Sequence, residues 1–384
     1  MDFRLNAEEQ AFRAKARDFA RTEIAPHAAR WDAEGSFPLD TLKHAAAQGF
    51  AAIYVHDEHG GAGFNRLAAT LIFEELAAAC PSTAAYLSIH NMVAWMIDQY
   101  GSPDQREHWI PKLARMEALG SYCMSEPDAG SDLAGLHARA TREGDEYVLN
   151  GVKSFVSGGG TSDIYLVLAR TGGEGARGVS CFLVEKNTPG LSFGAPEEKL
   201  GWRAQPTAMV KLENCRVPVA NRVGAEGAGF KIAMAGLDGG RVNIGACSVG
   251  GARACLEAAR LHIGTRSQFG RKLSRFQALQ FKLADMATAL DAARLLVRRA
   301  ARTIDFGHAE ATMYCAMAKR FAADTCFTIC DDALQLHGGY GYIKGSPVER
   351  YLRDLRVHRI MEGTSEIMRV VIARRLLAGM EIEV

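Results

Sequence analysis

The sequence lacks several features that would place it in a specialised class of protein. No apolar run approaches the length needed to cross a membrane, and 45 Lys and Arg nearly balance 44 Asp and Glu. That balance argues against nucleic acid or an anionic membrane as the main partner. The first residues carry acids and no apolar signal core, which predicts a cytoplasmic protein without a signal or transit peptide.

The usual metal and nucleotide motifs are missing as well. The nine cysteines form no C-x-x-C pair, so we expect reduced thiols and no zinc, no other metal and no disulfides. His337 and His358 have no metal-ligand spacing with other residues. No G-x-G-x-x-G or P-loop is present, which disfavours a Rossmann nicotinamide site.

Periodicity divides the chain into three parts. Apolar residues recur at helical spacing from residue 6 to about 118, for example Phe12, Ala16 and Phe19. Short β-branched or aromatic runs separated by Gly, Asn, Asp and Pro then indicate an antiparallel β domain or small barrel. Helical periodicity returns after Gly229. We therefore predict an α+β multidomain fold, with α-helical domains over residues 1–119 and 227–384 and a β domain over 120–226.

Two segments near the C-terminus have the strongest chemical character. Residues 331–342 contain adjacent glycines, Gly338 and Gly339, where the phosphates of a cofactor could approach the backbone. Glu362 directly precedes Gly-Thr-Ser at the predicted start of a helix. A base at that position could face a substrate while neighbouring backbone N–H groups receive negative charge.

Two segments of the predicted β domain have both a binding and a structural explanation. Residues 122–132 offer the hydroxyls of Ser125 and Ser131, although a polar turn explains them without a ligand. Phe155 and Ser157 precede three glycines and could cover a flat ring and hydrogen-bond its edge. A glycine-rich hairpin explains that segment equally well.

Two segments of the last domain leave the same choice open. Asp238 and Arg241 flank two glycines and form either a ligand site or a salt-bridged helix end. Residues 266–277 carry arginines and amides that could meet a diphosphate or lie on a solvated surface. The arginines of residues 350–375 alternate with acids, which favours ordinary helix ion pairs over a phosphate patch.

Six of these segments, taken in their order and spacing, resemble the acyl-CoA dehydrogenase family over essentially the whole chain. They are residues 122–132, 155–160, 237–243, 266–277, 331–342 and 359–367. The resemblance implies an N-terminal α domain, a central β domain and a C-terminal four-helix domain. It also implies an FAD-dependent enzyme that oxidises acyl-CoA and passes electrons to an electron-transfer flavoprotein. A homotetramer, built as a dimer of dimers, would bind FAD partly across a subunit interface.

The resemblance also assigns roles to individual residues. Glu362 matches the catalytic base; some relatives carry that glutamate about a hundred residues earlier, where this chain has Gly240. The residues matching contacts to the flavin ring are Tyr122, Met124, Ser125, Phe155 and Ser157. Those matching contacts to the FAD of a neighbouring subunit are Arg266, Gln268, Phe269, Gln277, Gln335, Gly338 and Gly339. Thr364 and Glu366 match cofactor contacts behind the catalytic loop, and the acyl-CoA contacts are Ser131, Asp238, Arg241 and Arg374.

Within the family, residues 88–98, 201–207, 337–344 and 357–360 resemble members that convert isobutyryl-CoA to methacrylyl-CoA in valine catabolism. The alternatives are 2-methylbutyryl-CoA and a short straight chain such as butyryl-CoA, because one methyl group changes selectivity only modestly. Two residues depart from the family. Asp128 stands where glycine is common and could weaken cofactor or CoA binding, and Asp238 stands where close relatives carry an amide.

Two other functions are consistent with the same resemblance. An oxidase would reduce oxygen directly, and an oxygen electrode would distinguish it from a dehydrogenase. A non-catalytic flavoprotein associated with DNA would need a strongly basic C-terminal face and a disrupted base. Glu362 is present and the charges nearly cancel, so the DNA-associated function is disfavoured.

Overall fold

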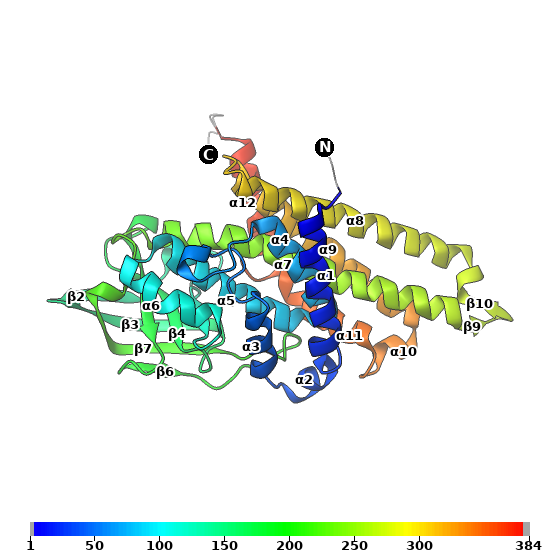
Figure 1. The fold of residues 1–384 in the computed structure, drawn as a ribbon, viewed down its shortest axis with the longest axis horizontal. Coiled ribbons are helices and arrows are strands. Elements are labelled where there is room, and N and C mark those ends of the chain that lie inside the picture. The colour runs from blue at the N-terminus through cyan, green and yellow to red at the C-terminus, as the bar shows by residue number, and fades with distance from the viewer. Residues whose placement is uncertain (1–3, 379–384) are drawn as a thin grey trace.

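The computed structural model describes residues 4–378, and it has an α, β, α order along the chain (Figure 1). This order confirms the predicted fold class. The first part is helical, and its α-helices are α1 (Ala7–Phe19), α2 (Ala28–Glu34), α3 (Leu39–Ala47), α4 (Arg66–Ala79), α5 (Pro81–Tyr100) and α6 (Pro103–Ala114). Asn6 and Ser102 close capping boxes at α1 and α6, which satisfies backbone N–H groups that would otherwise lack partners.

The middle part is a sheet with strand order β6-β7-β3-β2-β4-β5-β8 and with β1 beside β4. The strands are β1 (Gly120–Cys123), β2 (Arg139–Glu143), β3 (Glu146–Ser157), β4 (Ile164–Arg170), β5 (Val179–Glu185), β6 (Leu191–Phe193), β7 (Thr207–Pro218) and β8 (Arg222–Val223). Most pairs are antiparallel, but β1 runs parallel to β4. A parallel pair needs a long connection, and the chain makes β2 and β3 between the two strands.

The last part is built on one helix of 37 residues, α7 (Gly229–Thr265), which is about 55 Å long at 1.5 Å per residue. It extends from the sheet to the β9–β10 hairpin (Figure 1). The remaining elements are β9 (Ser267–Gln268), β10 (Arg271–Lys272), α8 (Gln277–Asp305), α9 (Ala311–His337), α10 (Gly339–Tyr342), α11 (Pro347–Arg356) and α12 (Ser365–Leu376). Helices α7, α8 and α9 pack together, and α12 packs on α9.

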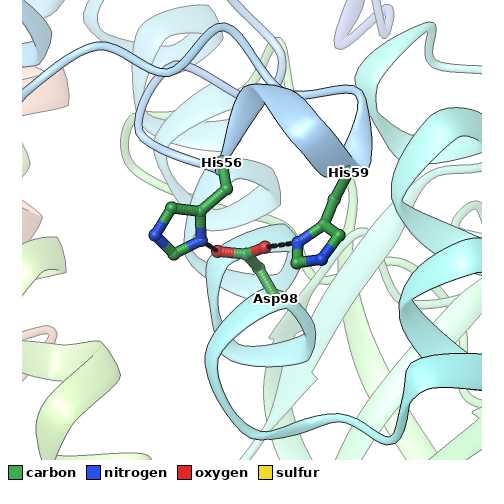
Figure 2. Close-up of side chains that lie close together, drawn as sticks. All are labelled: His56, His59 and Asp98. Carbon is green, nitrogen blue, oxygen red and sulfur yellow. Dashed lines mark hydrogen bonds and ion pairs between the residues drawn. The ribbon is translucent and has the colours of Figure 1, made fainter.

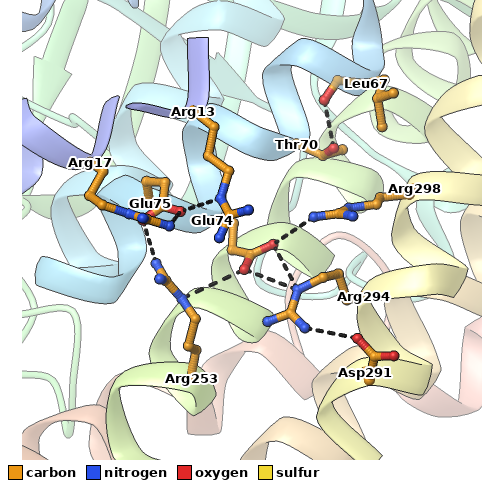
Figure 3. A network of polar contacts seen from close by, with 10 residues as sticks. All are labelled: Arg13, Arg17, Leu67, Thr70, Glu74, Glu75, Arg253, Asp291, Arg294 and Arg298. Carbon is orange, nitrogen blue, oxygen red and sulfur yellow. Dashed lines mark hydrogen bonds and ion pairs between the residues drawn. The ribbon is translucent and has the colours of Figure 1, made fainter. Parts of the chain in front are cut away.

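A buried polar network locks the first helical part onto the last. Glu75 of α4 accepts hydrogen bonds from Arg13 and Arg17 of α1 and from Arg253 of α7 (Figure 3). Its neighbour Glu74 pairs with arginines of α7 and α8. Burial opposes the charge on Glu75, but the arginine contacts outweigh it and lower its pKa to about 2. Helix α7 is therefore fixed relative to α1, α4 and α8, and the residues along it are held in place.

No helix among residues 4–378 has the length and apolar character needed to span a bilayer.

Candidate active site

Glu362 lies in a short connection between the 3-10 turn η7 (Val357–Arg359) and helix α12. Its φ is +52° and that of Gly363 is +89°, so two consecutive residues adopt left-handed backbone. For a glutamate this conformation is costly, and such strain often marks a functional position. The Thr364 side chain caps α12 by accepting a hydrogen bond from the Ile367 N–H at 3.2 Å. The carboxylate therefore sits immediately before a helix N-terminus.

Helix α9 holds both sides of this connection. Lys319 is fully buried and donates to the Gly363 carbonyl at 2.6 Å. Asp324, five residues further along the helix, accepts from the Ser365 hydroxyl at 2.9 Å and from Arg359 Nε at 3.0 Å. A rigid helix thus fixes the backbone on each side of Glu362. The Lys319 role was missed from sequence, although a lysine on the apolar face of a helix was a visible signal.

The Glu362 carboxylate is buried, and neither oxygen has a hydrogen-bond partner in the described chain. It rests against α7, where a Cβ placed on Gly240 would lie 2.5 Å from Oε2. Burial raises the pKa of Glu362 to about 7, while the charges of Lys319 and Arg241 partly oppose the shift. A carboxylate that is desolvated, unpaired and titrating near neutrality has the properties of a general base.

Asp238 and Arg241 are joined inside α7 instead of at a helix end. Arg241 Nη1 lies 2.8 Å from Asp238 Oδ1, and Thr312 of α9 donates to the other carboxylate oxygen at 2.6 Å. Arg241 Nε also donates to the Glu362 carbonyl at 3.3 Å. The structure thus brings Asp238, Arg241 and Glu362 together, with Thr312 as a partner that sequence reasoning missed.

Tyr122 of β1 belongs to the same group. Its hydroxyl is buried without a partner in the described chain, and burial raises its pKa well above the usual value, with a further contribution from Glu362. The following backbone is tied to β3, because Lys153 Nζ donates to the Met124 carbonyl and the Ser154 N–H donates to the Ser125 carbonyl. These bonds position Met124 and Ser125 through their backbone.

A second aromatic, Phe155, projects from β3 at a bulge where the pairing with β7 shifts register. Its φ is +56° and it is 72% exposed, an unusual combination for a phenylalanine. Two residues on, the Ser157 hydroxyl accepts from Gln205 Nε2 at 3.2 Å. The strained backbone thus presents an apolar ring to the outside, where a flat ligand could cover it.

A separate group of predicted residues lies at the far end of α7. There an open cavity of about 580 Å³ is lined by Arg266, Gln268, Gln335, Gly338 and Gly339. The lining also includes His337, to which the sequence assigned no role, and His262 and Lys282, which the sequence did not single out. Phe269 and Gln277 are not part of this lining; Phe269 is 92% exposed on the β9–β10 turn. Arg266 directly follows the last residue of α7 and is 25 positions from Arg241, which corresponds to about 37 Å at the helical rise per residue.

The remaining predicted residues have exposed side chains. Glu366 pairs with Arg369 on the surface of α12. Within residues 4–378 no hydrogen bond or ion pair joins Ser131 or Arg374 to Glu362. Asp128 is exposed on the loop after β1. In the absence of a ligand, these exposed side chains do not by themselves make up a binding site.

Models of three domains of one family match the chain in succession. They are the acyl-CoA dehydrogenase N-terminal domain (residues 6–117), middle domain (121–215) and C-terminal domain (227–377). The mitochondrial isobutyryl-CoA dehydrogenases of Dictyostelium discoideum and Bos taurus are 55% and 53% identical over 97% of this chain and 90% of theirs. Butyryl-CoA dehydrogenase from Megasphaera elsdenii superimposes with a TM-score of 0.95 and 37% identity, covering 98% of this chain and all of that one. The chain belongs to the acyl-CoA dehydrogenase family and is a flavin-dependent oxidoreductase.

Proposed function

We propose that this enzyme catalyses FAD-dependent α,β-dehydrogenation of a short branched acyl-CoA, most specifically isobutyryl-CoA to methacrylyl-CoA in valine breakdown. The observation that carries the proposal is the buried, unpaired carboxylate of Glu362 at the start of α12. The similarity to two isobutyryl-CoA dehydrogenases over nearly the whole chain supports the substrate. Electrons would then pass to an electron-transfer flavoprotein.

Several residues on and next to strands β1 and β3 fit the ring system of a flavin. Tyr122 has a buried hydroxyl without a partner, and Phe155 offers an exposed ring on strained backbone. With Met124, Ser125 and Ser157 they would hold the ring system, and Thr364 and Glu366 would contact it from behind the catalytic loop. Bound FAD would supply the hydride acceptor for the substrate β-carbon.

The second group of residues supports a neighbouring subunit's FAD as its ligand. Arg266, Gln268, Gln335, Gly338 and Gly339 surround one open cavity, which combines a cation, amides and exposed glycine backbone. The cavity lies about 37 Å from Arg241, at the opposite end of α7, where an FAD held mainly by a neighbouring subunit could be shared. We therefore include a homotetramer, with Phe269 and Gln277 at the shared site, in the proposal.

Glu362 would remove the α-proton of the thioester. A free carboxylate is too weak a base, but burial raises the Glu362 pKa and so strengthens it. The Glu362 backbone N–H donates to no group within residues 4–378, so it is available to the thioester oxygen. There it would stabilise the negative charge that develops as the proton leaves. Ser131, Asp238, Arg241 and Arg374 are the proposed contacts to the rest of acyl-CoA.

Large side chains beside Glu362 favour a short acyl chain. Arg66 is buried with its guanidinium 3.6 Å from the centre of the Tyr54 ring and 4.7 Å from that of Trp95. A Cβ on Gly239 would lie 2.3 Å from the Arg66 guanidinium. A Cβ on the next residue, Gly240, would lie 2.5 Å from Glu362 Oε2. The stack of Arg66, Tyr54 and Trp95 thus lies against the residue of α7 next to the one that faces the carboxylate, and it would limit chain length.

A panel of substrates tests the proposed function. We expect kcat/KM to be highest for isobutyryl-CoA and about 10-fold to 200-fold lower for 2-methylbutyryl-CoA, the usual effect of one extra methylene group, and we expect it to be lower also for the straight-chain isomer butyryl-CoA. The assay would use an artificial electron acceptor and would follow oxygen uptake in parallel. A higher kcat/KM for either competitor would overturn the substrate, and fast turnover with oxygen alone would indicate an oxidase.

The pH dependence of kcat/KM should follow the ionisation of Glu362 in the enzyme without bound substrate. We expect it to rise about tenfold per unit below pH 7 and to level off above, because only the ionised carboxylate accepts a proton. Lys319 lowers the Glu362 pKa by its charge, so Lys319→Met should move the midpoint to higher pH. Stopped-flow measurements across pH 5–9 would check this. A midpoint that is unchanged or moves to lower pH in the variant would contradict the assignment.

Gly240→Ala should inactivate the enzyme without unfolding it. The added methyl would lie 2.5 Å from Glu362 Oε2, and the end of a flexible side chain can move away at little cost to the fold. The displaced carboxylate would no longer reach the α-carbon, and a misplacement of 1 Å can cost about a hundredfold in rate. Gly264→Ala is the matched control, since it lies on the same helix with no atom within 4 Å of the added methyl. Equal turnover in the two variants would show that Gly240 does not make room for the base.

A further inference from the structure

Two histidines and a carboxylate meet at a site that the proposed reaction does not use. His56 Nδ1 lies 2.7 Å from Asp98 Oδ2, and His59 Nδ1 lies 2.6 Å from Asp98 Oδ1 (Figure 2). His56 is the N-cap of the 3-10 turn η2 (Asp57–His59) and His59 is its last residue, and Asp98 is near the end of α5. Residues three apart are eclipsed in a 3-10 turn, so both rings come to the same side and face one carboxylate.

The site carries negative charge, as a site that binds a cation requires. The Asp98 side chain is fully buried, and no Lys or Arg of the described chain lies within ion-pair distance of it. Its other hydrogen bond comes from the neutral amide of Gln99 at 2.8 Å. Asp57 and Glu58 are exposed between the two histidines and add negative charge. A buried carboxylate normally requires a cation, and in the described chain only two imidazoles and one amide contact Asp98.

The backbone that carries these three side chains is fixed by hydrogen bonds. Asn91 of α5 accepts from the Ile53 N–H at 2.7 Å and donates to the Phe50 carbonyl at 2.8 Å, which pins the segment before the histidines to the helix that carries Asp98. The Gly61 N–H closes the turn on the His56 carbonyl at 3.0 Å. The binding groups are therefore held together before any ligand arrives, which lowers the entropic cost of binding.

We propose that His56, His59 and Asp98 bind a divalent transition metal ion, with zinc as the best match. Imidazole nitrogen and carboxylate oxygen are standard zinc ligands, and the three ligand atoms lie within 4.8 Å of one another. Atoms that share a tetrahedral zinc lie roughly 3.3 Å apart at the usual bond lengths of about 2.0–2.2 Å. The rings would retreat slightly from Asp98, which His56 can do because its side chain is 57% exposed. The same exposure leaves water access to the fourth position.

This proposal departs from the sequence expectation of no metal, which considered the cysteines, His337 and His358. The sequence signal is an H-x-x-H pair at residues 56–59, but its third ligand is 39 positions away. Only the packing of η2 on α5 brings that carboxylate to the histidines.

Zinc binding to the full-length, flavin-loaded protein tests the proposal. The protein would be stripped with EDTA, desalted and dialysed against micromolar zinc chloride, and bound zinc would be measured by mass spectrometry. We expect one zinc per chain in wild type that is absent in the double variant His56→Gln/His59→Gln, and at least about tenfold weaker binding in each single variant. His44→Gln is the matched control, because His44 is an exposed histidine that faces a different carboxylate, Glu23.

Two results would overturn the proposal. One is equal zinc content in wild type and the double variant, and the other is no bound zinc in wild type, which would leave a hydrogen-bonded His–Asp–His cluster only. Thermal unfolding provides a second readout, since a ligand of the folded state raises Tm. Zinc should raise the Tm of wild type and of His44→Gln but not that of the double variant. Neither readout depends on enzyme activity, so the site can fail while the proposed function stands.

Discussion

Replacing Glu362 by Gln should lower turnover by more than about a hundredfold, the usual contribution of a general base. Glutamine keeps the size of the side chain but cannot accept the α-proton. Because neither Glu362 oxygen bonds to another group in the described chain, the fold and the bound flavin should be unaffected. The measurement is single-turnover flavin reduction by the acyl-CoA, which isolates the chemical step from electron transfer to the acceptor.

Glu107→Gln provides the control for this prediction, because Glu107 is an exposed glutamate on α6 and has no role in the site. It should reduce its flavin at the wild-type rate. If Glu362→Gln were as fast as Glu107→Gln, another group would have to be the base. A variant that lost its flavin would instead show that Glu362 supports the cofactor site.

Lys153→Met should destabilise the protein by about 3–5 kcal/mol, the cost of leaving one partner of a buried ion pair alone. Lys153 is fully buried and lies 2.7 Å from Glu126, whose carboxylate also accepts the His137 and Ala138 N–H groups. Lys153 further donates to the Met124 carbonyl, so the backbone next to Tyr122 should loosen. Urea unfolding and flavin content would measure the two effects.

Two variants accompany Lys153→Met. Lys211→Met removes an exposed lysine from the neighbouring strand β7 and should change the free energy of unfolding by less than about 0.5 kcal/mol. The double variant Glu126→Gln/Lys153→Met removes both charges and should recover part of the lost stability. Similar unfolding midpoints for Lys153→Met and Lys211→Met would contradict the importance of the buried pair.

Much of the architecture was predictable because it depends on local patterns. Apolar spacing and capping residues mark the helices, and short β-branched runs mark the sheet. The position of Glu362 before a helix followed in the same way, from Gly363 and the capping hydroxyl of Thr364. One alternative for Asp238 and Arg241, a salt-bridged helix end, was wrong, because the two residues pair inside a continuous helix.

The rest of the site depends on contacts between distant segments. Only the relatives that carry the catalytic glutamate at the position of Gly240 indicate that Gly240 of α7 faces the base, and nothing in the sequence indicates that Lys319 of α9 bonds the carbonyl of Gly363. The sequence also does not show that Glu126 and Lys153, which are 27 positions apart, form a buried ion pair. These contacts arise only when the helices pack, and they set both the position and the pKa of the proposed base.

The most direct test is an anaerobic titration of the flavin-loaded protein with isobutyryl-CoA, followed by the absorbance of the flavin. We expect prompt bleaching in the wild-type enzyme, complete at a lower concentration of isobutyryl-CoA than of butyryl-CoA or 2-methylbutyryl-CoA. In Glu362→Gln bleaching should be nearly absent on the same timescale. A flavin that stays oxidised with every acyl-CoA would contradict the proposed reaction. Bleaching by another thioester alone would preserve the reaction and overturn the substrate.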